Sequence, residues 1–439
     1  MRERASERWR QQGLGAVLVG IVLLTGAPPA MAAAGDLDPS FGTGGKVTQS
    51  FTGRYAGIEA VAFQSDGKIV AVGSATTPDG DGEFVVSRYN VDGTPDATFN
   101  GDGTFAMGLV SGCCDETLLD VAIQPDGKIV AVGYSYDHGA LTYSPVLIRL
   151  RPDGRLDGTF GNGGVVLDDA LAFSEADAVA LQPDGKIVVA GKASPDVTRF
   201  FVARYGTDGV PDTTFSGDGR QRTTFGGGFA WAEDVAVLDG GKILAVGRAD
   251  DQTGRLGFAL ARYTLKGGLD QSFGTRGRVL SQLGREGAWA HSVAILPGKH
   301  ILVGGEVYSR STGSFAVARY TADGTLDPAY GGGDGWTRTP LDSGLTHAFG
   351  MALQPDGKPI LAGYATPGNQ RYYFTLVRYG LHGAVDRTFG DNGIVLTSFG
   401  PTTGDGDFAQ AVAVDDQGRI LAGGFTGEGE FALARYLGA

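Results

Sequence analysis

The chain has few cysteines and no surplus of positive charge. Its 439 residues include only two cysteines, Cys113 and Cys114, which are adjacent. They cannot form a disulfide framework, and neighbouring cysteines bridge each other only with strain because their Cα atoms lie about 3.8 Å apart. The formal net charge is −13. Nucleic-acid binders usually carry a basic stripe that neutralises phosphates, and this sequence shows none, so we expect no nucleic-acid partner.

Long apolar runs are also scarce, and the longest lies near the N-terminus. Residues 14–25 (LGAVLVGIVLLT) follow a stretch with several arginines and precede small residues. This run is shorter than the roughly 20 residues that cross a bilayer. The pattern is typical of a secretory signal peptide over residues 1–34, cleaved after Ala32 or Ala34, with an uncleaved membrane anchor as the alternative. We therefore expect a secreted or cell-envelope, extracytoplasmic protein without a membrane span after cleavage.

Glycine is abundant, with 74 residues, and much of it belongs to a repeat. Gly adopts positive φ in tight turns without a Cβ clash, so its abundance favours many short strands joined by turns. One unit recurs seven times at intervals of 56 to 61 residues, with Ala at its third position and Gly at its end in every copy. The copies are AVAFQSDGKIVAVG (60–73), DVAIQPDGKIVAVG (120–133), AVALQPDGKIVVAG (178–191), DVAVLDGGKILAVG (234–247), SVAILPGKHILVGG (292–305), GMALQPDGKPILAG (350–363) and AVAVDDQGRILAGG (411–424). Apolar residues that alternate on both sides of a central turn predict a β-hairpin in each copy.

A second unit follows each copy, as in FVVSRYNVDGTPDATF at 84–99. Its Arg occurs in all seven copies, and in the first six an Asp follows eight residues later. These pairs are Arg88 and Asp96, Arg149 and Asp157, Arg204 and Asp212, Arg262 and Asp270, Arg319 and Asp327, and Arg378 and Asp386. A three-residue turn between the partners places them opposite each other on one face of a hairpin. The spacing therefore predicts a charge-assisted pair in each repeat.

The seventh Arg, Arg435, lacks an Asp eight residues later, because the chain ends at Ala439. The missing half-repeat is at the other end, where Leu37-Asp38-Pro39-Ser40-Phe41-Gly42 matches residues 269–274. A closed ring explains this split, since the first segment can complete the last sheet and remove an exposed edge. The sequence therefore predicts an all-β fold over residues 35–439, a seven-bladed β-propeller with four antiparallel strands per blade. The fourth strand of blade 7 is expected within residues 37–51. The blades themselves are expected at about 52–109, 110–168, 169–224, 225–282, 283–340, 341–398 and 399–439.

The QPDGKIVVAG unit and the FALARY unit with its following LDxxFG resemble delta-60 repeats, a family of exported bacterial proteins. The resemblance covers roughly residues 37–437. It implies a propeller-like fold and an extracytoplasmic location. It implies no reaction and no catalytic residues.

The sequence lacks the standard catalytic motifs. It contains no G-x-S-x-G elbow, no H-E-x-x-H, no C-x-x-C and no P-loop. We therefore consider an enzyme less favoured than a binding protein, and assign neither catalytic residues nor metal ligands.

The most promising position for a binding site is the mouth of the central channel, where the innermost strands begin. Variable residues of all blades meet there in one concavity. The expected ligand-binding residues are Glu59, Asp120, Asp177, Trp231, Glu233, Asp234, Trp289, His291 and His347. A mouth variant such as Trp231→Ala should then weaken ligand binding and leave folding intact. In the alternative interpretation, the aromatic residues pack between blades and the carboxylates are merely solvated.

Three functions follow as alternatives. The leading one is a binding or interaction scaffold for a protein, glycan or small-molecule ligand. The second is an extracellular hydrolase or lyase that uses the acidic mouth, with or without Ca²⁺, and the third is a purely structural spacer. We expect no cofactor, although the acidic loops Asp79-Gly80-Asp81-Gly82-Glu83 and Gly404-Asp405-Gly406-Asp407 offer the oxygen ligands that Ca²⁺ prefers. A solvated acidic loop is the favoured interpretation of both.

Overall fold

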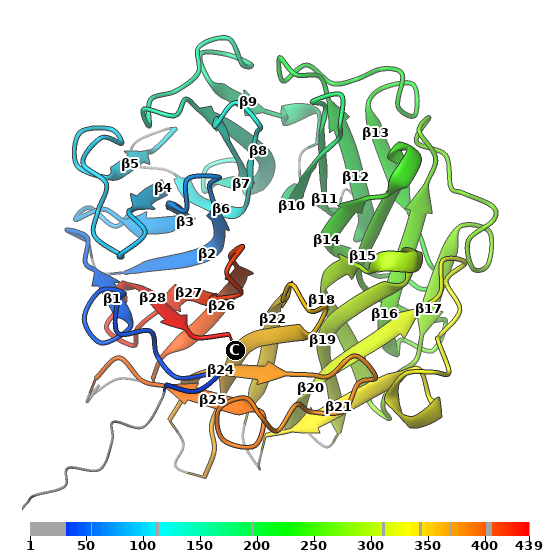
Figure 1. Ribbon diagram of the computed structural model, residues 1–439. Coiled ribbons are helices and arrows are strands. Elements are labelled where there is room, and N and C mark those ends of the chain that lie inside the picture. The colour runs from blue at the N-terminus through cyan, green and yellow to red at the C-terminus, as the bar shows by residue number, and fades with distance from the viewer. Residues whose placement is uncertain are drawn as a thin grey trace, which may run out of the picture. The chain divides into compact units, whose positions relative to one another are not determined.

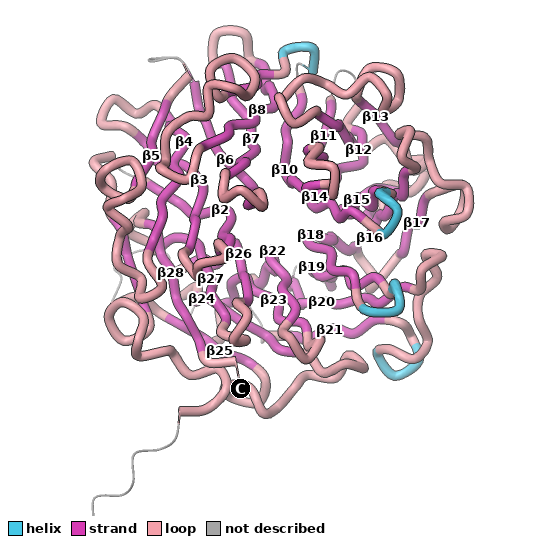
Figure 2. The backbone as a smooth tube through the Cα atoms, turned by 45° about the horizontal axis from the view of Figure 1, so that its top comes forward, coloured by secondary structure: helices cyan, strands magenta, loops and turns pink. Residues whose placement is uncertain are grey.

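The fold is a ring of seven four-stranded antiparallel sheets, as the sequence predicts (Figure 1). The computed structural model describes residues 32–438, except for 54, 110–113, 172, 195–196, 310–311, 342–344, 369–370 and 401–405. One compact unit begins at Ala33, and within it the chain consists almost entirely of strands and turns (Figure 2). The described residues contain no helix with the length and hydropathy of a membrane span. Residues 1–31 of the predicted signal peptide lie outside the described residues.

In six blades, four consecutive strands run from the channel outward, and we refer to them as strands A to D. Blades 1 to 3 comprise β2 (Ala56–Phe63), β3 (Ile69–Thr76), β4 (Gly82–Tyr89) and β5 (Thr104–Met107); β6 (Cys114–Ile123), β7 (Ile129–Asp137), β8 (Thr142–Leu150) and β9 (Val165–Leu167); and β10 (Ser174–Leu181), β11 (Ile187–Ala193), β12 (Arg199–Tyr205) and β13 (Arg220–Thr223). Blades 4 to 6 comprise β14 (Ala230–Val237), β15 (Ile243–Asp250), β16 (Leu256–Tyr263) and β17 (Arg278–Ser281); β18 (Gly287–Ile295), β19 (Ile301–Ser309), β20 (Thr312–Tyr320) and β21 (Trp336–Pro340); and β22 (Thr346–Leu353), β23 (Pro359–Ala365), β24 (Tyr373–Arg378) and β25 (Ile394–Thr397).

Blade 7 takes its strands from both ends of the chain. It comprises β26 (Phe408–Val414), β27 (Ile420–Phe425), β28 (Phe431–Tyr436) and β1 (Lys46–Gln49). β1 pairs antiparallel with β28, from Lys46 opposite Ala434 to Gln49 opposite Phe431. The ring is therefore closed by the N-terminal strand, as predicted, and the sheet of blade 7 has the same number of strands as the others.

The predicted Arg–Asp pair forms in every blade. In six blades the Nε atom of the Arg donates to an Asp Oδ2 at 2.7 to 2.8 Å, including Arg435 to Asp38 at 2.8 Å. In blade 6, Arg378 Nε lies 3.0 Å from Asp386 Oδ2 as an ion pair. Each guanidinium also lies over the ring of the aromatic residue three positions after its Asp, for example 4.7 Å from the Phe99 centroid in blade 1. A planar, always charged fork suits both contacts at once, and Lys could not replace it.

The same arginines connect neighbouring blades. The Nη1 atom of Arg88 donates to the carbonyl of Pro152 in blade 2, and the corresponding bond recurs from blade to blade until Arg435 donates to Val91 in blade 1. These bonds run in one direction around the whole ring. Each Arg therefore stabilises both its own blade and the boundary with the next.

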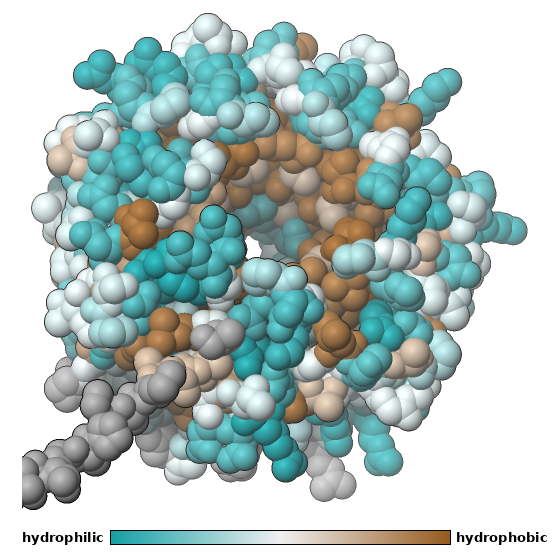
Figure 3. Space-filling model, in the orientation of Figure 1, coloured by the Kyte–Doolittle hydropathy of each residue, from teal (hydrophilic) through white to brown (hydrophobic). Residues whose placement is uncertain are grey.

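The Ala of each repeat lies where the blades converge. Ala180 of β10, for example, packs with Val235 and Val237 of β14 in one hydrophobic cluster. Inner strands lie close together near the axis, so a larger side chain at this position would overfill the space. Viewed along the axis, the central hollow is lined largely by hydrophobic residues (Figure 3).

Candidate functional site

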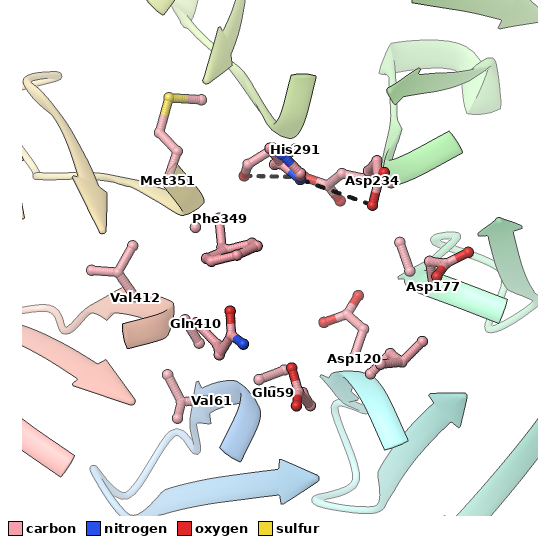
Figure 4. A pocket seen from close by; sticks show the side chains of 17 residues that line it. Glu59, Val61, Asp120, Asp177, Asp234, His291, Phe349, Met351, Gln410 and Val412 are labelled. Carbon is pink, nitrogen blue, oxygen red and sulfur yellow. Dashed lines mark hydrogen bonds and ion pairs between the residues drawn. The ribbon is translucent and has the colours of Figure 1, made fainter. Parts of the chain in front are cut away.

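One irregularity recurs in all seven innermost strands and builds the mouth of the channel. The A–B register shifts by one residue between Ile58 and Ala60, and the same β-bulge recurs in every other blade. The bulged residues are Glu59, Leu119, Asp177, Glu233, His291, Phe349 and Gln410. Four of them, Glu59, Asp177, Glu233 and His291, are predicted mouth residues. All seven line one cavity of about 300 Å³ on the axis (Figure 4). A bulge re-aims its unpaired side chain, which accounts for this convergence.

Four carboxyl groups of this cavity, those of Glu59, Asp120, Asp177 and Asp234, have raised pKa values. Burial raises the pKa of Glu59 to about 7. Burial also raises the pKa of Asp177 well above its ordinary value, with further contributions from the charges of Glu175 and Glu233. The cavity therefore becomes more negatively charged as the pH rises through neutrality.

Asp120 and Asp234 line the same cavity, but they also join neighbouring blades. Asp120 accepts hydrogen bonds from the backbone N–H of Val121 at 2.8 Å and of Val179, in the next blade, at 2.7 Å. Asp234 bonds Val235 and, in the next blade, Val293 in the same way, both at 2.7 Å. Burial raises the pKa of Asp120 to about 7, with help from the charge of Asp234, and burial raises the pKa of Asp234 to about 6. Both carboxylates therefore have a structural role at the axis.

Trp231 belongs to a row two residues before the bulges. Its indole N–H donates to Asp177 Oδ2 at 2.9 Å. Lys192 Nζ lies 3.8 Å from the centre of its ring, and the guanidinium of Arg248 lies 4.4 Å away. Lys192 in turn pairs with Glu175 at 2.9 Å. The Trp231 ring is thus already occupied by cations of the chain itself, which supports the packing interpretation for this residue.

Arg248 is the centre of the next part of the mouth. Its guanidinium also lies 4.4 Å from the ring centre of Trp289, so it contacts both indoles. Its Nη2 pairs with Glu233 Oε1 at 3.1 Å, and its side chain is only 12% exposed. Cation–π contacts strengthen when water is excluded. A cationic ligand would therefore have to displace Arg248 to reach these rings.

Glu306 organises two histidines in blades 5 and 6. This fully buried carboxylate accepts hydrogen bonds from His347 Nδ1 at 3.0 Å, from the hydroxyl of Tyr308 and from the backbone N–H of Ala348 at 3.1 Å. His291 Nε2 lies 3.7 Å from it. Burial would raise the pKa of Glu306, but hydrogen bonds and charge from His291 and His347 lower it to about 2. A carboxylate at Nδ1 fixes the orientation and tautomer of His347 and leaves Nε2 for another partner.

Aromatic rings continue from His347 around the mouth, and we call these residues the aromatic arc. His347 stacks on Phe349 and packs against Tyr364, and Tyr364 contacts both Tyr372 and Phe408. From Phe408 the arc continues through Phe425 of blade 7 to Tyr55 of blade 1. Its members are Trp289, Tyr308, His347, Phe349, Tyr364, Tyr372, Phe408, Phe425 and Tyr55. Apart from the more exposed Tyr55, these rings are half-buried.

The structure thus brings all nine predicted residues to one end of the channel, but in two rows with different environments. Glu59, Asp120, Asp177, Glu233, Asp234 and His291 line the axial cavity, and Trp231, Trp289 and His347 form the row beyond it. Lys192, Arg248, Glu306 and Tyr364 were not predicted. They lie on strand B directly after the last Gly of the repeat and pair in register with Glu175, Trp231, Trp289 and His347. The sequence offers one signal for these four residues, because each occupies a variable position directly after the regular repeat unit.

Metal binding receives no geometric support in the part of the chain that is described. No group of three or more His, Cys, Asp or Glu side chains there is arranged to hold an ion. The loop around Asp79 closes as a tight turn in which the N–H of Thr77 bonds the carbonyl of Asp81 at 2.8 Å. In the second acidic loop, Asp407 accepts the N–H of Phe399 at 3.0 Å, whereas residues 404 and 405 lie outside the described residues, as does Cys113.

Six segments of the chain match the model of a β-propeller family described as a domain of unknown function, DUF5122. The matched residues are 64–99, 124–160, 182–215, 241–273, 299–330 and 354–389. These six segments are therefore similar to the repeats of a β-propeller family. Each match begins near the turn between strands A and B and ends close to the aromatic residue under the Arg, so these propeller repeats include the Arg–Asp pair.

The solved structures that match this chain share little sequence with it, and no curated protein matches it. A virginiamycin B lyase from Staphylococcus aureus is 10% identical, with a TM-score of 0.49, over 89% of this chain and 99% of that chain. The β-propeller domain of the Trilobed protease from Pyrococcus furiosus is 11% identical, with a TM-score of 0.44, over 89% and 95%. A protein of unknown function from Dyadobacter fermentans is 13% identical, with a TM-score of 0.40, over 91% and 99%.

Proposed function

We propose that this chain is an exported binding module of the delta-60 repeat type, and that its ligand occupies the mouth of the channel. Export rests on the basic and apolar pattern of residues 1–34. Binding rests on the half-buried aromatic arc beside a cavity to which all seven blades contribute. Half-buried rings that converge with a few polar groups are the usual composition of a ligand site.

The ligand that best fits this surface is a neutral glycan. The faces of Trp231 and Trp289 that would attract a cation already contact Arg248, so a cationic ligand is disfavoured. The rings of Tyr364 and Phe408 offer apolar faces, and Tyr hydroxyls, Gln410 and the carboxylates offer hydrogen-bond partners. Sugar rings present an apolar face and a rim of hydroxyls, which matches this arrangement.

A binding experiment with neutral hexasaccharides tests the proposal. Maltohexaose, cellohexaose, xylohexaose and chitohexaose are titrated calorimetrically into the purified protein. We expect at least one to bind, and Tyr364→Ala to weaken that binding about tenfold or more. Tyr136→Ala is the matched control, because Tyr136 is a half-buried Tyr of blade 2, which contributes no ring to the arc. Equal affinities of the two variants, or no binding of any neutral glycan, peptide or small molecule in a broad screen, would reject a ligand site at the arc.

A hydrolase or lyase is the second candidate, and one observation favours it. Buried Glu306 holds the Nδ1 side of His347, which leaves Nε2 suited to accept or donate a proton. If the chain is an enzyme, His347→Asn should abolish turnover even at a saturating concentration of the glycan. An unchanged rate in that variant would remove His347 from any reaction.

A further inference from the structure

The two ends of the described chain together form one turn that every other blade forms with a continuous chain. In blade 1, strand C is followed by the turn Asn90-Val91-Asp92-Gly93-Thr94, in which Asn90 N–H bonds Thr94 O and Gly93 N–H bonds Asn90 O. In blade 7, Leu437 N–H bonds Asp36 O at 2.9 Å, and Gly35 N–H bonds Leu437 O at 2.8 Å. The blade 7 turn therefore consists of Leu437-Gly438 from one end and Ala34-Gly35-Asp36 from the other.

Ala34 occupies the third position of this turn and makes the hydrogen bond that belongs to that position. In the other six boundaries, the carbonyl of that residue accepts an N–H from the preceding blade. The bonds run from Gly42 to Asp92, Asn100 to Asp153, Gly161 to Asp208, Ser216 to Lys266, Gly274 to Asp323 and Gly331 to His382. At the seventh boundary Gly390 N–H donates to Ala34 O at 2.9 Å. Without Ala34, the N–H of Gly390 loses the partner that its counterparts have in every other blade.

Gly35 fixes the path of this segment. Its φ is +93°, and a Cβ atom there would lie 2.6 Å from the backbone nitrogen of Gly390. Only Gly fits a left-handed conformation at so close an approach. Next to it, the backbone nitrogen of Ala33 donates to Asp36 Oδ2 at 2.7 Å, whereas Ala32 and Ala33 are themselves exposed.

We propose that the chain is processed by hydrolysis of the peptide bond between Ala32 and Ala33, and that the new N-terminus is a structural part of the ring. This inference rests on the proposed export. Water adds across the bond, so that Ala32 leaves as a carboxylate and Ala33 acquires an ammonium group next to the Asp36 carboxylate. Small residues at Ala30 and Ala32 suit a signal peptidase. Cleavage after Ala34 satisfies the same enzyme but removes the acceptor of Gly390.

The cleavage site is tested by secretion of the full chain from a bacterial host, followed by intact mass measurement and N-terminal sequencing. The expected product begins at Ala33. A product that begins at Gly35, or one that retains residues 1–32, would overturn the proposed site. The ring-closing role is tested separately from export, so the two parts can fail independently.

Three chains released from a fusion with native ends, beginning at Ala33, Ala34 and Gly35, are compared in thermal melts. Residues from Ala33 onward form one compact unit, so these chains retain the whole fold. Loss of Ala33 alone should have little effect, because its contact with Asp36 is exposed. Loss of Ala34 should lower Tm by about 1 to 2 °C, the shift expected when a ring of this size loses one backbone hydrogen bond. Equal melting of the Ala34 and Gly35 chains would show that Ala34 does not close the ring.

Discussion

Arg435 donates to Asp38 at 2.8 Å although 397 residues separate them in the sequence. The six other Arg–Asp pairs join residues only eight positions apart. The geometry is the same in both cases, so the ring has one boundary where chain continuity is replaced by hydrogen bonds, an ion pair and one strand pairing.

Asp38→Ala should destabilise the protein by about 3 to 5 kcal/mol, because it leaves the buried charge of Arg435 without its partner. Urea unfolding measures the loss. The double variant Asp38→Ala/Arg435→Leu is the control, since removal of both charges should restore part of the stability. A single variant as stable as the parent would mean that the pair contributes nothing to closure.

Removal of residues 35–51 should have a larger effect. It deletes β1, exposes the edge of β28 and leaves Arg435 unpaired. Exposed edge strands template association with other chains, so we expect aggregation or a strongly lowered Tm, measured by light scattering during a melt. Melting like that of the parent protein is incompatible with the closure described above.

The acidic cavity should make stability depend on pH. The folded pKa of Glu59 is about 7, above its ordinary value, so the folded state binds this proton more tightly than the unfolded state. The resulting stabilisation is complete below about pH 4 and disappears as the pH rises through 7. Asp120 and Asp234 act in the same direction, with pKa values of about 7 and 6. Asp386, whose pKa is lowered to about 2, acts oppositely, but only in strong acid. Tm should therefore fall between pH 5 and pH 8.

Glu59→Gln isolates this effect, because the amide has a similar shape and does not ionise. The variant should reduce the fall between pH 5 and pH 8 by about 1 to 3 kcal/mol in unfolding free energy. Glu430→Gln is the control, since Glu430 lies in the strand B–C turn of blade 7, away from the cavity lining. Parallel pH profiles for the parent and Glu59→Gln would show that Glu59 is ionised in the folded protein at all these pH values.

Trp231→Ala should lower stability by about 3 kcal/mol or more, because its ring packs against Lys192 and Arg248 and its indole N–H bonds Asp177. This differs from the expectation from sequence that folding would be intact. Denaturant unfolding decides between the two, with Trp231→Phe as the control that keeps a ring. An unchanged midpoint for Trp231→Ala would restore the simpler view of an exposed binding residue.

The repeat predicts the fold because its spacing carries the information. The recurring Arg, the Asp eight residues later and the displaced half-repeat at Asp38 determine the strand order and the closure, and the structure confirms both. The bulge could not be predicted, because it is a property of register between strands A and B. The bulge directs Glu59 and its six counterparts into the channel. No particular residue type marks the bulged position in the sequence.

The chemical character of the mouth was harder to predict than its position. The sequence predicts Trp231 and His347 at the mouth, but their partners Arg248 and Glu306 lie on another strand. Cross-strand contacts decide whether an indole is free or covered and whether an imidazole is oriented. Such contacts depend on which residues face each other, and single positions along the chain do not reveal that.

The divided turn of blade 7 makes the location of the chain ends interchangeable in principle. The other six boundaries have the same hydrogen bonds with an unbroken backbone, so each could be opened if Gly438 and Ala34 were joined by a short tether. Circular permutants opened at these turns would then differ only in the order of synthesis and not in the finished ring. The termini of the chain could therefore lie at any of seven nearly equivalent turns in the same ring.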